Sequence, residues 1–223
     1  MADLPSQTEI RILAAGDIHG VTDVYDWLGQ MVRRHTADLL ILAGDLFTLG
    51  SEQEQREQSK QIIPLLKRAE VPCFYLMGND DSVGLDYTDG QIKPLHGRCL
   101  TLRGRRFVGY EYTPPFIGDA FVKTENEIEK DLRSIERLLD NRCIFVTHAP
   151  AKGVLDRTYL GERVGSPSVA ALLDRKPVLA HIHGHIHESF GHEANHFNVA
   201  SAGQKRAFLI GIPSLEHLML QGE

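Results

Sequence analysis

The sequence has few of the features that mark a secreted or membrane protein. Its 223 residues include only three cysteines, which are far apart at positions 73, 99 and 143. This argues against a disulfide framework or a cysteine zinc site. No apolar run approaches membrane-spanning length. The first ten residues, MADLPSQTEI, lack the charged-then-apolar layout of a signal peptide. We therefore expect a cytoplasmic protein.

Basic residues are outnumbered by acidic ones. The chain has 24 lysines and arginines against 30 aspartates and glutamates, a net charge of −6. We therefore expect no membrane contact and no dedicated nucleic-acid-binding region. Hydrophobic residues make up 42% of the chain, enough for an ordinary core. No repeat or linker divides residues 1–223, so we expect a single domain. The sequence does not determine its oligomeric state.

Short apolar runs alternate with amphipathic segments along the chain. Five runs are typical of buried strands, at residues 10–15, 39–43, 73–77, 143–147 and 178–182. Helical periodicity predicts helices over residues 22–35, 51–69 and 124–139. The last of these begins with a capping box formed by Thr124 and Glu127. Strands alternating with helices indicate a layered α/β fold.

Two segments depart from this alternation. Residues 100–112 are typical of a hairpin that turns at Gly104, and residues 189–220 contain strand-like pieces without a convincing helix. Part of the sheet structure is therefore expected to be antiparallel. The loops at 111–123 and 149–167 are long, and long ordered loops often bind ligands.

Side chains that can bind a metal follow every one of the five predicted strands. The blocks read Gly16-Asp17-Ile18-His19, Gly44-Asp45, Gly78-Asn79-Asp80, His148 and Gly184-His185-Ile186-His187. Glycine permits a sharp turn and a close approach of the backbone to an ion. Sites in open α/β sheets form at the carboxyl ends of strands. The pattern therefore predicts that the five strand ends converge on one metal site.

This order of blocks, from residue 16 to residue 187, resembles the calcineurin-like metallophosphoesterase superfamily. The stretches THAPAKGVLDR (147–157) and GHIHES (184–189) are most similar to its small prokaryotic phosphoesterases. The resemblance implies an α/β fold in which a two-sheet β-sandwich is flanked by helices, a four-layer αββα arrangement. It also implies a two-metal site at one edge of the sandwich.

The resemblance also implies the ligands. One ion would be held by Asp17, His19, Asp45 and His187, and the other by Asp45, Asn79, His148 and His185. Ions in such sites lie about 3.5–4 Å apart, and a bridging carboxylate and hydroxide offset their repulsion. A donor set without thiolate suits Mn²⁺, Fe, Zn²⁺ or Ni²⁺, and we favour Mn²⁺.

The expected function is that of a binuclear metal-dependent phosphoesterase. A metal-activated bridging hydroxide would hydrolyse a small phosphate ester or nucleotide-like substrate, with phosphodiesters favoured over monoesters. Two alternatives remain: a catalytically weak metal-binding scaffold, or a nucleotide-binding module of the same fold. A protein phosphatase is disfavoured, because GDLFTLG (44–50) lacks the phosphate-binding arginine of those enzymes.

One position departs from the family pattern. Many relatives have Gly-Asn-His where this chain has Gly78-Asn79-Asp80, and that histidine is thought to assist the leaving group. Asp80 is therefore a candidate catalytic residue, with a simple turn residue as the alternative. Nearby cations favour the ionised form of a carboxyl group, so Asp80 is a poor proton donor unless burial reverses the shift.

The segment HIHGHIH (181–187) contains four alternating histidines. His185 and His187 are expected to face the metals. His181 and His183 lie earlier, within the strand, and are assigned to packing or to hydrogen bonds that orient the ligands. The remaining histidines carry no comparable pattern and are expected to be surface or structural residues: His35, His96, His192, His196 and His217.

Overall fold

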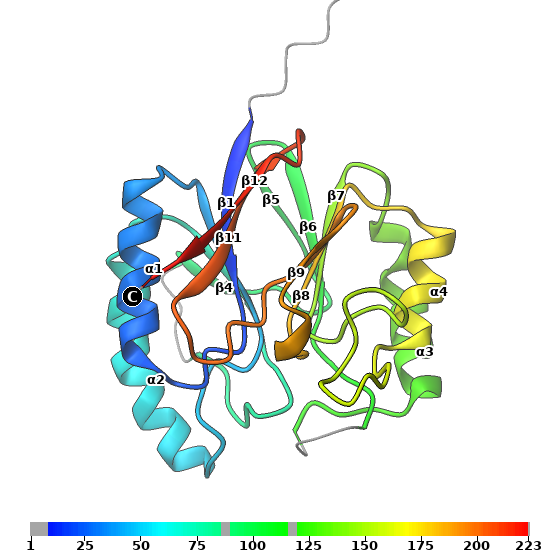
Figure 1. Ribbon diagram of the computed structural model, residues 1–223, viewed down its shortest axis with the longest axis horizontal. Coiled ribbons are helices and arrows are strands. Elements are labelled where there is room, and N and C mark those ends of the chain that lie inside the picture. Colours follow the sequence, from blue (N-terminus) through cyan, green and yellow to red (C-terminus); the bar gives the residue numbers. More distant parts are fainter. Residues whose placement is uncertain (1–8, 86–89, 116–119, 223) are drawn as a thin grey trace, which may run out of the picture.

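A computed structural model describes residues 9–85, 90–115 and 120–222. Two six-stranded sheets pack face to face, and two helices cover the outer face of each (Figure 1). The four-layer sandwich predicted from the sequence is confirmed. No helix in these ranges has the length and apolar character needed to cross a bilayer. Residues 1–8 of the segment MADLPSQTEI lie outside the described residues.

The first sheet has the strand order β12-β11-β1-β2-β3-β4. Its strands are β1 (Ile10–Ala15), β2 (Leu39–Ala43), β3 (Cys73–Leu76), β4 (Ile92–Pro94), β11 (Arg206–Ile212) and β12 (His217–Gln221). The first four pair in parallel, while β11 and β12 are antiparallel to their neighbours. Parallel neighbours need crossovers, and α1 (Thr22–Arg34) and α2 (Glu52–Lys67) supply two of them.

The second sheet has the order β5-β6-β7-β8-β10-β9. Its strands are β5 (Cys99–Leu102), β6 (Arg105–Tyr110), β7 (Cys143–Thr147), β8 (Ala180–His183), β9 (Gly191–Glu193) and β10 (His196–Asn198). Its crossover helices are α3 (Glu125–Ile135), continued by the 3-10 turn η1 (Glu136–Leu138), and α4 (Pro167–Arg175). A further 3-10 turn, η2 (His187–Ser189), follows β8.

The central strands are buried on both faces, which explains their uninterrupted apolar sequences. In β1, Ile12 packs between the two sheets, whereas Leu13 packs beneath the helices of the first sheet. In β2, Ile41 and Leu42 divide in the same way. The candidate ligands Asp17 and Asp45 lie just beyond the ends of these two apolar strands.

Most of the predicted elements are confirmed. The three predicted helices are present, and Thr124 and Glu127 form the capping box. The predicted hairpin turns at Gly104, whose φ is +78°. The sequence prediction missed the short strand β4 and the helix α4. Ser166 caps α4 and a proline occupies its first turn, which is a recognisable start signal that the prediction did not use.

The two sheets pack closely against each other at Gly109 in β6. A Cβ atom at this position would lie 2.7 Å from Leu95 Cγ and 2.9 Å from Leu76 Cδ2. Both leucines belong to the apolar cluster between the sheets. Any larger residue would therefore force the sheets apart or push these side chains from their rotamers.

We expect Gly109→Ala to lower the free energy of unfolding by about 1–3 kcal/mol, the usual cost of overpacking a core. Gly84→Ala is the matched control, because a Cβ there meets only Tyr75 Oη, at 3.5 Å. Urea unfolding followed by circular dichroism measures both variants. Equal stabilities would show that the sheets tolerate a wider separation at Gly109.

Candidate metal centre

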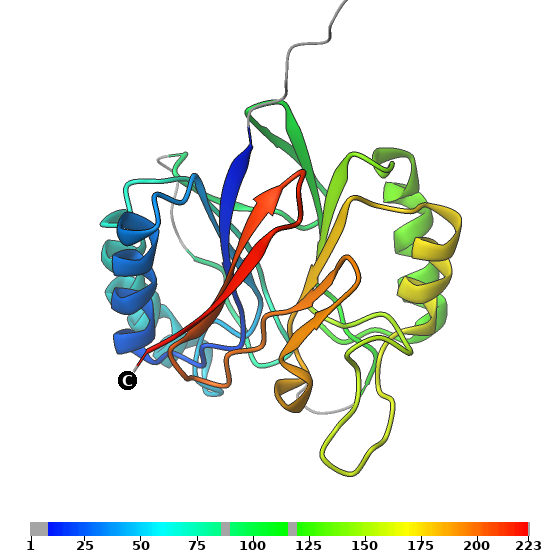
Figure 2. The same ribbon diagram turned by 45° about the horizontal axis from the view of Figure 1, so that its top comes forward.

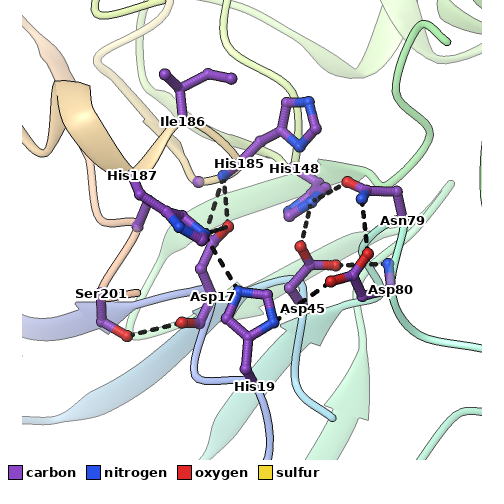
Figure 3. A network of polar contacts seen from close by, with 12 residues as sticks. Asp17, His19, Asp45, Asn79, Asp80, His148, His185, Ile186, His187 and Ser201 are labelled. Carbon is purple, nitrogen blue, oxygen red and sulfur yellow. Dashed lines mark hydrogen bonds and ion pairs between the residues drawn. The ribbon is translucent and has the colours of Figure 1, made fainter. Parts of the chain in front are cut away.

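The carboxyl ends of strands from both sheets meet at one edge of the sandwich. There the side chains form two neighbouring clusters (Figure 3). One contains Asp17, His19 and His187, and the other contains Asp45, His148 and His185; within each, the potential ligand atoms lie within 4.8 Å of one another. Asn79 contacts the second cluster. The structure thus brings together all seven predicted metal ligands.

The first cluster joins the end of β1 to the segment after β8. His19 Nε2 lies 3.2 Å from His187 Nε2, which lies 3.2 Å from Asp17 Oδ1. The backbone N–H of His185 donates to both oxygens of Asp17, at 3.0 Å each. Burial alone would lower the pKa of His187, but its hydrogen bond to Asp17 and the charge of that carboxylate raise it.

His148 is fixed at the centre of the second cluster. Its Nδ1 lies 2.7 Å from the carbonyl oxygen of Ala43. A carbonyl can only accept, so Nδ1 carries a proton and Nε2 points into the site. Nε2 lies 3.1 Å from Asn79 Oδ1 and 3.4 Å from Asp45 Oδ2. Because both neighbours are oxygen acceptors, a positive centre is required between them, either a proton or a metal ion.

His148 and Asp45 shift each other's pKa in opposite directions. Burial alone would lower the pKa of His148, but the charge of Asp45 and the hydrogen bond to it raise the pKa to about 10. Burial alone would raise the pKa of Asp45, yet His148 lowers it well below its usual value. Imidazole, carboxylate and amide donors around a centre that demands positive charge are suited to divalent transition metals.

Several ligands have a strained backbone. The φ angles of Asp17, His19, Asp45 and His185 are +54°, +50°, +50° and +73°. The left-handed region is sparsely populated by residues other than glycine, and such strain is typical of functional sites. It directs consecutive side chains away from the strand direction and toward the site.

The glycines before the ligands act differently from the sequence expectation. Only Gly44 has a positive φ, +96°. Gly78 and Gly184 instead provide space, because a Cβ would lie 2.1 Å from Asp45 Oδ1 at Gly78 and 2.4 Å from Asp17 Oδ2 at Gly184. The sharp turn is thus made largely by the ligands themselves, and these two glycines permit the approach of the ligand side chains.

Asp81 is a structural member of the site that sequence reasoning did not identify. This fully buried carboxylate accepts backbone N–H groups from Leu46 at 3.0 Å, Phe47 at 2.9 Å and Gly78 at 2.8 Å. Burial and the charge of Asp45 raise its pKa. Asp81 therefore ties the turn after β2 to the turn after β3. A second carboxylate directly after Asp80 was the available signal.

Asp80 lies at the cavity over the site. Its Oδ1 accepts a hydrogen bond from Asn79 Nδ2 at 3.0 Å, and its Oδ2 lies 3.5 Å from His19 Nδ1. Its backbone N–H donates to Asp45 Oδ1 at 2.9 Å. Partial burial, and next the charge of Asp45, raise the pKa of Asp80. Its position permits contact with a substrate, while its catalytic role stays a prediction.

The two earlier histidines of HIHGHIH lie behind the site. His181 Nε2 lies 2.9 Å from Thr147 Oγ1, and its Nδ1 lies 3.0 Å from Nδ1 of His196. Thr147 Oγ1 donates to the carbonyl of Ala149, so it accepts from His181. Burial lowers the pKa of both His181 and His183 and keeps them neutral. His181 therefore serves packing and hydrogen bonding, and His196 is its structural partner.

A cavity opens over the two clusters. Its lining comprises His19, Asp45, Asn79, Asp80, Thr158, Tyr159, His185, Ile186, His187 and Glu188. Tyr159 and Glu188 were not predicted as site residues. Neither Arg157 nor Arg163 lines the cavity: Arg157 Nη1 donates to the Gly161 carbonyl at 2.8 Å, and Arg163 Nη1 to Asp156 Oδ1 at 2.6 Å.

Solved structures share this fold. A Thermus thermophilus protein, TT1561, is 17% identical, with 96% of this chain matching 99% of that chain at a TM-score of 0.73. A dimetal phosphatase from Danio rerio is 12% identical, with 96% of this chain matching 99% of that chain at a TM-score of 0.54. At these identities the likeness shows the fold alone.

Sequence comparison assigns the family. A UPF0046 protein of Caenorhabditis elegans is 26% identical over 171 residues, which are 69% of this chain and 58% of that relative's length. The similarity to prokaryotic members in particular stays a prediction. The family model described as calcineurin-like phosphoesterase matches residues 10–189, which include every block of the metal-site pattern. With this match and the sandwich fold, the chain belongs to the calcineurin-like phosphoesterase family.

Proposed function

We propose that this protein is a binuclear metal-dependent phosphoesterase that prefers phosphodiesters. The observation that carries the proposal is the position of Asp45. Its carboxylate groups with His148 and His185 on one side and with His19 on the other. A carboxylate shared in this way suits two ions a few ångströms apart. Small phosphate esters or nucleotide-like molecules are the proposed substrates, and we keep the cytoplasm as the proposed location.

The residues fit two divalent ions. Asp17, His19, Asp45 and His187 would hold one, and Asp45, Asn79, His148 and His185 would hold the other. Such ions supply Lewis acidity and a nucleophilic water at neutral pH. The donor set suits Mn²⁺, Fe, Zn²⁺ or Ni²⁺, with Mn²⁺ our favoured ion.

The chain positions these donors before any ion binds, and an ion would take the place of the proton that Asp45 holds on His148. The carbonyl of Ala43 sets the tautomer of His148, and burial lowers the pKa of His185 to about 4. A neutral imidazole is the form that binds metal. The backbone N–H of His185 orients Asp17, and Asp81 fixes the turns that carry Asp45 and Asn79. Little reorganisation is therefore needed at the moment of reaction.

The cavity lining supports the preference for diesters. Among the described residues that line it there is no lysine or arginine, while Asp80 and Glu188 place two carboxyl groups on its wall. A monoester carries close to two negative charges at neutral pH, whereas a diester carries one. Because Coulomb repulsion scales with the product of the charges, these carboxylates disfavour the monoester more.

The first prediction of the proposed function concerns the metals. After Mn²⁺ loading and desalting, elemental analysis of wild type is expected to find two ions per chain. Asp45→Ala should retain less than half of this metal and lose turnover of bis(4-nitrophenyl) phosphate, because each ion loses a ligand. Asp26→Ala is the matched control, since the Asp26 carboxylate accepts a hydrogen bond from Gln30 in the same helix, α1, and does not line the cavity.

Two results would count against the proposal. Absence of metal from loaded wild type would exclude the binuclear centre. Two ions per chain with no turnover of any ester would instead favour the metal-binding scaffold or the nucleotide-binding module.

The second prediction concerns Asp80. A nitrophenolate leaving group needs little protonation, so Asp80→Asn should change cleavage of the activated diester by only a few-fold. General acid help is worth about 10²–10⁴-fold when it is needed. Asp80→His should therefore raise turnover of alkyl monoesters by roughly tenfold or more.

Steady-state kinetics with both ester types, together with metal analysis of each variant, tests this. If Asp80→Asn abolishes diester cleavage while its metal content stays intact, Asp80 is an essential catalytic group and the expectation that it contributes little to diester cleavage is wrong.

A further inference from the structure

A narrow hairpin, which we call the arm (residues 156–165), projects from the loop between β7 and α4. Figure 2 shows this yellow-green segment extending away from the body of the molecule. Arg157 and Arg163 form an antiparallel bridge, the Thr158 N–H donates to the Glu162 carbonyl at 3.0 Å, and the Gly161 N–H donates to the Thr158 carbonyl at 2.9 Å. These bonds define a tight turn whose tip carries Tyr159 and Leu160.

The base of the arm is anchored firmly. The buried carboxylate of Asp156 accepts hydrogen bonds from the Gly153 N–H at 2.8 Å and from the Arg163 guanidinium. The Arg157 N–H donates to Ser189 Oγ at 3.1 Å, and that hydroxyl donates to the Arg157 carbonyl at 2.8 Å. Ser189 belongs to η2, which also carries His187. The arm is therefore fixed in position relative to the metal ligands.

The tip of the arm presents apolar surface next to the site. Tyr159 is 80% exposed and Leu160 is 69% exposed, yet Tyr159 also lines the cavity over the ligand clusters. Two other large exposed apolar residues, Val21 and Leu49, lie on the loops that follow β1 and β2 at the same edge. Single exposed apolar residues are ordinary. An aromatic ring at the mouth of a reactive cavity has a more specific use, because it offers a rigid stacking face.

The dimensions of the cavity require a substrate to reach its rim. The cavity measures about 160 Å³, whereas sites that enclose a small organic ligand measure roughly 300–1,000 Å³. The phosphate group fits, but a larger ester group must extend to the mouth, where Tyr159 supplies the aromatic face. The carboxyl groups of Asp80 and Glu188 on the wall disfavour a second anionic group there. The favoured group is therefore planar, aromatic and uncharged or cationic, as nucleobases are.

We propose that Tyr159 is the specificity-determining residue of this site and that it stacks on a planar aromatic group, such as a nucleobase, of the phosphate ester. The inference rests on the proposed phosphoesterase function and names the class of substrate for it. Tyr159 acts on binding of the ester and not on the bond that is broken.

The test compares two pairs of ligands that differ in the aromatic group: adenosine 5′-monophosphate with ribose 5-phosphate, and phenyl phosphate with ethyl phosphate. Isothermal titration calorimetry measures their affinities for Mn²⁺-loaded protein. We expect wild type to bind the aromatic member of at least one pair five- to tenfold more tightly, the lower part of the range known for base–aromatic stacking. A preference in the first pair identifies a nucleobase, and a preference in the second alone identifies a smaller ring.

Three variants make the test specific. Tyr159→Ala should abolish the preference, while Tyr159→Phe should retain it because the ring remains. Leu160→Ala, the neighbouring exposed residue that does not line the cavity, should leave it unchanged. Wild type without a preference in either pair, or an unchanged preference in Tyr159→Ala, overturns the inference.

Turnover of bis(4-nitrophenyl) phosphate by wild type separates this failure from failure of the proposed function. A protein that cleaves the diester but shows no Tyr159-dependent preference refutes the role of Tyr159 alone. A protein with neither metal nor turnover refutes the phosphoesterase function itself.

Discussion

The hydrogen bond from His148 Nδ1 to the carbonyl of Ala43 is the contact on which the site depends. It crosses from the end of β7 in one sheet to the end of β2 in the other. It fixes the imidazole in one tautomer and aims Nε2 at Asp45 and Asn79. The contact exists only because residue 44 is glycine, since a Cβ there would lie 2.3 Å from His148 Nδ1. When the two sheets pack together, the metal ligands at their strand ends are therefore brought together as well.

The same edge concentrates strain that the rest of the fold must offset. Each residue in the left-handed region costs on the order of 1–3 kcal/mol, and four of the candidate ligands adopt it. Asp81 holds two of the turns through three backbone hydrogen bonds, and the apolar layers on both sides of each sheet hold the strand ends from which the turns start. The core thus stabilises a ligand geometry that an isolated loop would not keep.

The sequence predicts the strands and the convergence of the ligands, because these follow from hydrophobic periodicity and from the order of motifs along the chain. Apolar runs indicate the strands, and the glycine-ligand blocks at their ends indicate convergence at one edge. The role of Asp81 could not be predicted, because its three partners are set by the approach of two loops. The position of Tyr159 at the cavity depends on the contact of Ser189 with Arg157, and no periodicity encodes it. The helix α4 was missed for a different reason. Its N-terminal start signal is present in the sequence, but a helix of nine residues shows only a weak hydrophobic periodicity.

Charge links the metal site to its proposed substrate. The described cavity lining has no lysine or arginine, so the side chains offer no fixed cation to attract phosphate. In the proposed function that attraction comes from the two divalent ions, whose charge exceeds that of the ligand carboxylates Asp17 and Asp45. Asp80 and Glu188 then reduce the remaining positive charge on the side where the ester group extends. A site balanced in this way suits an ester with one negative charge at phosphorus and an uncharged group at the rim, which is the chemistry that the ring of Tyr159 can recognise.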